Sequence, residues 1–108
     1  MATYKINIDP SGQSAVFNPS TQAVDAGDQV SWTNNDSKPH WPGLLNPDGS
    51  FVGLVDRELT TSPPFNVSSV WSAPARVDSN GNQISYTLTY VDRYDHNMQG
   101  IFQINPTP

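Results

Sequence analysis

The sequence contains no cysteine in its 108 residues, so the chain forms no disulfide and offers no thiolate to a metal. Only five lysine and arginine residues are present, scattered along the chain, against ten aspartate and glutamate residues. With a net charge of −5 and a pI near 4.5, no basic stripe can neutralise phosphates, which counts against nucleic acid and anionic membranes as partners. No apolar run approaches the roughly 18 residues needed to cross a bilayer.

Aromatic residues supply the apolar area that a disordered polar chain would lack. Three Trp, four Tyr and four Phe accompany ten Pro and seven Gly, which follow no period. A chain of this length predicts one domain, residues 1–108, and we expect a monomer. The first residues enter a strand pattern directly, without a signal peptide. Such a start also fits a chain whose export signal has been removed, and we expect a natural chain of that kind to be periplasmic or secreted.

Apolar and polar residues alternate with a period of two, and no helical stripe exceeds a turn or two. The predicted strands lie at residues 4–8, 15–17, around 24, 30–32, 66–71, 83–91 and 100–105. The stretch 37–64 is rich in turn-forming residues and is predicted to be mostly loop, with a short strand at 51–55 or one helical turn within 54–61. About seven to eight short strands separated by turns predict an all-β fold, a Greek-key β-sandwich.

The clearest strand, residues 83–91, leads to the most informative residue of the chain. Its even-numbered residues, from Ile84 to Tyr90, share one face, and Asp92 continues that face if the strand stays regular. A carboxylate at the edge of the core needs a partner, which is a metal, a backbone donor, a cation or water. In the alternative interpretation the strand bends after Tyr90 and Asp92 is solvated in a loop.

Two segments together carry a resemblance to a known family. Gly27 to Asp36 (GDQVSWTNND) is followed by Pro39-His40, and Tyr86-x-x-x-Tyr90 is followed by Met98-x-Gly100-Ile101. These segments resemble the small blue-copper proteins, the cupredoxins of the plastocyanin and amicyanin type, over roughly residues 15–40 and 84–104. The resemblance implies a β-sandwich with copper at one end. One His would come from the loop after the Trp-Thr-Asn strand, and Cys, His and often Met from the loop before the last strand.

The resemblance also implies a set of candidate metal ligands. It places His40 at the first ligand position and Met98 at the axial position. Aligned on Met98, the family's Cys-x-x-His-x-x-Met spacing puts Asp92 where the Cys belongs and Asp95 where the second His belongs. His96, one residue later, matches no position of the family motif and would serve instead if the loop shifts. The candidate metal residues are therefore His40, Asp92, Asp95, His96 and Met98.

Replacement of the thiolate changes the chemistry that such a site can support. A blue-copper centre depends on a short copper–thiolate bond in a His/His/Cys arrangement. Aspartate is a harder oxygen ligand, which favours Cu(II) over Cu(I) and also admits Zn(II). We therefore expect a pale or colourless site for a divalent ion, with copper as the cofactor and zinc as the alternative, and poor electron transfer.

Three hypotheses about function follow from these residues. In the first, an altered site binds copper or another divalent ion. In the second, the site is lost and the fold serves as a metal-free scaffold or protein-interaction module. In the third, the acidic residues were introduced at the ligand positions of a laboratory variant. No Ser-His-Asp set, phosphate loop or zinc-protease motif is present, so no enzymatic activity is expected.

The candidate ligands also have purely structural interpretations. His40 would pack on Trp41 as a loop residue, and Met98 would fill the core, because a thioether adapts to irregular gaps. His96 and Asp95 would be solvated in the loop before the last strand.

Overall fold

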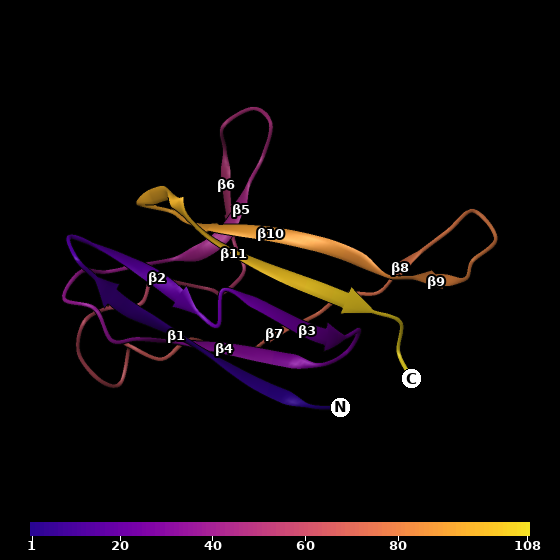
Figure 1. Cartoon of the computed structure of the whole chain (residues 1–108), viewed down its shortest axis with the longest axis horizontal. Coiled ribbons are helices and arrows are strands. Elements are labelled where there is room, and N and C mark those ends of the chain that lie inside the picture. Colours follow the sequence, from indigo (N-terminus) through magenta and orange to yellow (C-terminus); the bar gives the residue numbers. More distant parts are fainter.

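Eleven β-strand segments and their connecting turns make up the computed structural model, which describes all of residues 1–108 (Figure 1). No helix is present, and hence none that is long and apolar enough to cross a membrane. The strand bounds, in chain order, are β1 Thr3–Ser11, β2 Ser14–Asn18, β3 Thr21–Asp25, β4 Gln29–Asn34, β5 Pro42–Leu45, β6 Phe51–Gly53, β7 Trp71–Ser72, β8 Arg76–Val77, β9 Gln83–Ile84, β10 Tyr86–Asp92 and β11 Asp95–Asn105.

The strands form two mixed sheets and one separate hairpin. The first sheet has the order β2-β1-β4-β7, and the second has the order β3-β11-β10-β5-β6. Two pairs are parallel, β1 with β4 and β11 with β3, while the other pairs are antiparallel. Figure 1 shows the β5–β6 hairpin rising from the sandwich, and the β8–β9 hairpin extending beyond the start of β10. The all-β sandwich predicted from the alternating pattern is confirmed.

Aromatic side chains from both sheets fill the space between them. The rings of Tyr90 and Phe102 stack with centroids 5.0 Å apart, and Trp32 meets both of them edge-on. All three residues are at most 1% exposed, and each such burial contributes about 1.5–3 kcal/mol. The Trp32 indole N–H donates to the Tyr90 hydroxyl over 3.2 Å, so neither polar group is left without a partner. Burial raises the pKa of Tyr90 far above its usual range, which keeps this phenol neutral.

Gly100 lies directly across the β10–β11 ladder from Tyr90. A Cβ atom at this position would collide with the Tyr90 ring. The ring therefore lies across the backbone of β11, and only glycine leaves it room. The Met-x-Gly sequence thus has a packing role in this fold.

Several predicted element boundaries differ from the structure. β1 continues through Pro10 to Ser11, because its parallel pairing with β4 ends at Ile8 and Pro10 pairs on one side only, with Ala15. The last strand begins at Asp95 and not at Gly100. Residues 83–91 divide at Ser85 into β9 and β10.

The segment predicted to be mostly loop holds a β-hairpin of its own. β5 pairs with β6 through Gly43–Gly53, Leu44–Val52 and Leu45–Phe51, so one of its two strands was missed. The helical turn considered within residues 54–61 is absent. Asn66–Val70 is not a strand, although Val67 bridges to Thr33 beside β4.

Candidate functional site

His40 lies in the loop between β4 and β5, where both of its main-chain polar groups form hydrogen bonds with Leu59. Its N–H donates to the Leu59 carbonyl over 3.2 Å, and its own carbonyl accepts the Leu59 N–H over 2.7 Å. The preceding loop is held by Asn34, which is buried at the end of β4 and donates its side-chain amide to the Lys38 carbonyl over 2.8 Å. The side chain of His40 therefore projects from a well-fixed backbone.

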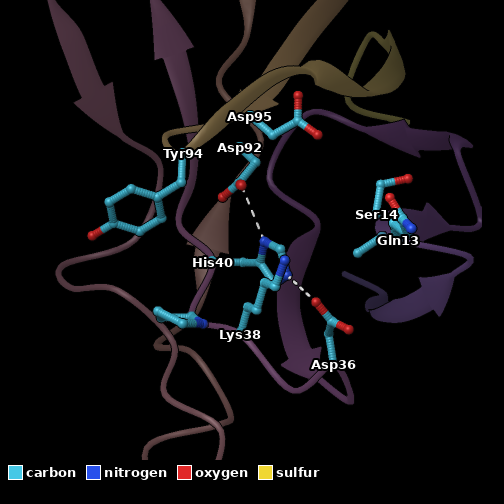
Figure 2. A pocket seen from close by; sticks show the side chains of 10 residues that line it. Gln13, Ser14, Asp36, Lys38, His40, Asp92, Tyr94 and Asp95 are labelled. Atoms are coloured by element: carbon cyan, nitrogen blue, oxygen red, sulfur yellow. Dashed lines mark hydrogen bonds and ion pairs between the residues drawn. The ribbon is translucent and has the colours of Figure 1, made fainter.

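Both ring nitrogens of His40 contact carboxylates. Nδ1 lies 3.0 Å from Asp92 Oδ2, and Nε2 lies 2.7 Å from Asp36 Oδ2. Figure 2 shows the imidazole between these two side chains, with a dashed line to each. His40 is 6% exposed and Asp92 is completely buried. The Asp36–His40–Asp92 cluster is thus a buried charge network.

Asp92 makes hydrogen bonds through both of its carboxylate oxygens. While Oδ2 faces His40, Oδ1 accepts the backbone N–H of Trp41 over 2.7 Å. β10 continues through this residue, since Asp92 pairs with Pro42 on β5, although the ladder to β11 shifts its register between Val91 and Asp92. The Asp92 side chain is completely buried and contacts His40. The inward orientation predicted from strand parity is therefore confirmed, and the solvated-loop alternative is wrong. No buried side-chain nitrogen or oxygen in the chain lacks a hydrogen-bond partner.

The two carboxylates favour the charged form of the imidazole. Burial of His40 lowers its pKa, but the hydrogen bonds and charges of Asp92 and Asp36 outweigh that effect, so its pKa is raised above the ordinary value. Conversely, the hydrogen bond from His40 holds the pKa of Asp36 below its usual range. A carboxylate only accepts hydrogen bonds, and an imidazolium donates from both nitrogens. The contacts of both ring nitrogens and the raised pKa of His40 therefore favour the carboxylate–imidazolium–carboxylate form.

The remaining predicted ligands lie around this cluster without completing a metal centre. Asp95 lines a pocket of about 400 Å3 together with Asp36, His40 and Asp92. His96 is exposed and lines no pocket. Met98 is 5% exposed, belongs to the hydrophobic core, and lines a neighbouring pocket.

The donor atoms of this site do not fit a bound metal ion as they are arranged. A metal ligand needs a free lone pair, but both His40 nitrogens are directed at carboxylates, so the ring would have to lose a proton and turn before it could bind an ion. No group of three or more His, Cys, Asp or Glu side chains is placed to hold a metal ion. The chemistry that the cluster offers is electrostatic, namely a fixed positive ring between two negative groups.

The sequence predicted two members of the cluster and missed the others. The sequence identifies His40 and Asp92 as candidates, and the fold does bring them together. Asp36 was seen only as part of a family motif, and its spacing of four residues from His40 was the one local signal available. The Trp41 N–H had no signal, because a backbone donor looks the same at every position.

Comparisons with known proteins identify the fold. No protein-family model matches the sequence, and no curated protein matches it. The structure of a purple cupredoxin from Nitrosopumilus maritimus is similar with a TM-score of 0.65 at 17% identity, covering 94% of this chain and 98% of that one. Amicyanin from Paracoccus versutus is similar with a TM-score of 0.66 at 14% identity, covering 95% of this chain and 81% of that one. A Cu(I) form of an amicyanin variant has a TM-score of 0.61 at 15% identity, with 93% and 81% covered. The chain therefore has the cupredoxin fold.

Proposed function

We propose that this protein is a metal-independent binding domain, in which the Asp36–His40–Asp92 cluster stands where related folds hold copper. The observation that carries the proposal is the pairing of both His40 nitrogens with carboxylates, at 3.0 Å and 2.7 Å. A histidine held in this way has its lone pairs occupied by protons, and metal binding would have to displace them.

The cluster supports the fold in the way a metal ion would. It ties the β4–β5 loop, which carries Asp36 and His40, to Asp92 at the end of β10. The same carboxylate holds the Trp41 N–H and so anchors the start of β5. A buried ion pair with every hydrogen bond made preserves a loop conformation, even where its net stabilisation is small. In this proposal the cluster, and not a cofactor, holds the loops at this end of the sandwich together.

Electron transfer is not the activity that these residues support. The similar amicyanin variants described as Cu(I) forms are copper proteins. This chain has no cysteine, and hence no thiolate for the short copper–sulfur bond of a blue centre. We infer that binding of another molecule, most simply a protein, replaces electron transfer as the function.

Binding of a divalent metal remains the second candidate, and one observation favours it. Three carboxylates, Asp36, Asp92 and Asp95, line the same pocket as His40. Copper or zinc would have to displace a proton from His40 and turn it away from at least one carboxylate. His96 and Met98 would join the ligands only if the β10–β11 loop rearranged, since one is exposed and the other is packed in the core.

Calorimetric titration of the purified chain with Cu(II), and separately with Zn(II), distinguishes the two functions. We expect no stoichiometric heat that depends on His40. The matched variants are His40→Ala, which removes the buried ring, and His96→Ala, which removes the exposed one. Stoichiometric binding that is lost in His40→Ala and kept in His96→Ala would overturn the metal-independent proposal and establish the second candidate.

Domain organisation, oligomeric state and location complete the proposal. We propose that residues 1–108 form one cupredoxin-like domain, which is monomeric and acts in the periplasm or outside the cell. The acidic surface charge keeps such a domain soluble and counts against nucleic acid as a partner.

A further inference from the structure

The edge of β10 that faces away from β11 lacks a partner strand over most of its length. β5 pairs with β10 only at Val91 and Asp92. At the other end, β8 pairs with β9, which leads into β10. Figure 1 shows the two hairpins diverging from opposite ends of β10, with no strand along the edge between them. The gap covers residues 85–90.

Two threonines present their main-chain groups to this gap. The Arg93 N–H donates to the Trp41 carbonyl over 2.9 Å on the β5 side, which shows that odd-numbered residues bond to that side. Because main-chain groups alternate along a strand, the N–H and C=O of Thr87 and Thr89 point into the gap. No strand is paired with them there, and no loop or side chain makes a hydrogen bond to them. Four main-chain hydrogen-bonding groups are therefore open along this edge.

The residues of this edge carry none of the features that usually prevent another chain from pairing with it. Exposed edges in soluble proteins are commonly protected by a lysine, a proline, an inward charge or a bulge. Residues 85–90 read Ser-Tyr-Thr-Leu-Thr-Tyr and contain none of the protecting residues. The register shift near Asp92 inserts its extra residues in β11, so β10 itself stays regular. This segment is thus a template for strand addition.

The flanking strands limit what can occupy the gap. β5 and β8 stand at its two ends, and both run antiparallel to the strand they pair with. A second copy of this chain would bring its own β5 and β8 on the same edge, where they would overlap with those of the first. An extended segment without neighbours of its own fits between them. A peptide running in the same direction as β5 and β8 would continue the existing antiparallel order of the sheet.

Arg76 lies at the end of the gap next to residue 85. The C-terminus of a peptide that runs antiparallel to β10 would lie at this end. Arg76 is the first residue of β8 and lies opposite Ile84. Its guanidinium lies 4.2 Å from the centre of the Tyr86 ring, it is exposed, and it forms no salt bridge within the chain. In an acidic protein, this unpaired cation beside an open edge selects a carboxylate.

We propose that the open edge of β10, residues 85–90, binds an extended segment of a partner protein that adds a strand antiparallel to β10 and places a carboxylate on Arg76. Main-chain hydrogen bonds to Thr87 and Thr89 hold the segment, as in other cases of strand addition. This inference rests on the proposed function, since it names the surface and the kind of partner through which a metal-independent domain acts.

The test uses the full chain, labelled with nitrogen-15, and the peptide acetyl-Thr-Val-Thr-Val-Thr-Glu with a free terminal carboxylate. In the free protein, the amides of Thr87 and Thr89 are expected to exchange with solvent quickly, while those of Leu88 and Tyr90 are protected by β11. Saturation with the peptide is expected to slow exchange at Thr87 and Thr89 by about tenfold or more. Equal protection of all four amides in the free protein, or no change at millimolar peptide, overturns the proposal.

Two N-methylated peptides distinguish main-chain hydrogen bonding to β10 from non-specific binding to the protein surface. One carries methyl groups on the amides of its odd residues and the other on those of its even residues. Because alternate amides face the protein, one peptide is expected to lose binding and the other to keep it. Equal affinity of the two peptides overturns the proposal.

Protein variants test the edge and the cation separately. Thr89→Pro removes one donor, at an edge position where proline is tolerated, and is expected to abolish binding while the circular dichroism spectrum is kept. Arg76→Glu is expected to lower the affinity for the peptide that ends in glutamate about tenfold. The same variant is expected to bind the corresponding peptide that ends in lysine more tightly. Unchanged peptide affinity in Arg76→Glu overturns the assigned polarity and carboxylate contact.

The two proposals fail on different measurements. All peptide titrations are run with a chelator present, so a failure to bind peptide overturns only the edge site. Stoichiometric copper binding that depends on His40 overturns the metal-independent function without changing amide exchange at Thr87 and Thr89.

Discussion

Asp92 Oδ2 lies 3.0 Å from Nδ1 of His40, although the two residues are 52 positions apart in the chain. The contact joins the loop after β4 to the end of β10 and is completely shielded from solvent on the carboxylate side. In this buried setting, loss of one partner leaves the other charge uncompensated.

Asp92→Ala is expected to destabilise the protein by about 3 kcal/mol, since it leaves the His40 ring nitrogen and the Trp41 N–H without partners. Urea unfolding at pH 7 measures this loss. The control is Asp95→Ala, because Asp95 lines the same pocket. This substitution removes only the hydrogen bond that Asp95 accepts from the Asn97 N–H. It is expected to cost about 1 kcal/mol or less. Equal losses for the two variants would contradict the central role given to Asp92.

Stability is expected to fall as the pH rises through the neutral range. The pKa of His40 is raised in the folded protein, so its contribution is complete below its unfolded value of about 6.5 and is lost as the pH passes the folded value. Urea unfolding between pH 5 and 9 measures the decline, and the ring resonances of His40 report its folded pKa directly. In His40→Gln the decline should vanish. A folded pKa of His40 below its unfolded value of about 6.5 would contradict the imidazolium assignment.

Asp36 makes stability depend on pH in the opposite direction to His40, with a loss as the pH falls in the acid range. Its pKa is lowered in the folded protein, chiefly by the hydrogen bond from His40. Its contribution is therefore complete above its unfolded value and is lost as the pH falls through the folded value. Asp36→Asn should flatten the acid limb of the stability curve and leave a neutral-range decline, because Asp92 still contacts the ring. An unchanged acid limb would show that other carboxylates set it.

Gly100→Ala is expected to cost about 1–3 kcal/mol, because the added methyl group collides with the Tyr90 ring across the ladder. A double-mutant cycle with Tyr90→Leu measures the coupling by urea unfolding. In the Tyr90→Leu background, the same methyl group should cost little, since the ring that it meets is gone. Additive losses would show that the glycine is required for another reason.

Addition of Cu(II) is expected to produce no intense blue absorption. The chain supplies no thiolate, and that ligand is the source of the copper–sulfur character of a blue site. A visible spectrum of the protein with equimolar Cu(II) is compared with that of amicyanin under the same conditions. An intense blue colour would contradict the argument from the missing sulfur.

Strand positions were largely predictable because the pattern that encodes them is local. Val30 and Trp32 alternate with polar neighbours, as do Tyr86, Leu88 and Tyr90, and all belong to the strands expected of them. The β5–β6 hairpin was predicted only in part, since Gly43 and Gly53 read as turn residues. In the fold they are paired across the hairpin, where Phe51 and Trp41 lie over them. Such packing depends on rings that no local window identifies.

Alternation along residues 84–92 is sufficient to aim Asp92 inward, and the lack of cysteine is sufficient to remove blue-copper chemistry. Both follow from the chain alone, because strand parity and residue type are local properties. The partners of Asp92 are not local. Its oxygens could bind a metal together with Asp95 and His96, or they could contact His40 and the Trp41 N–H. Which of these occurs depends on how the β4–β5 loop folds against β10. The same holds for the open edge of β10, which exists only because β5 and β8 diverge from it in space.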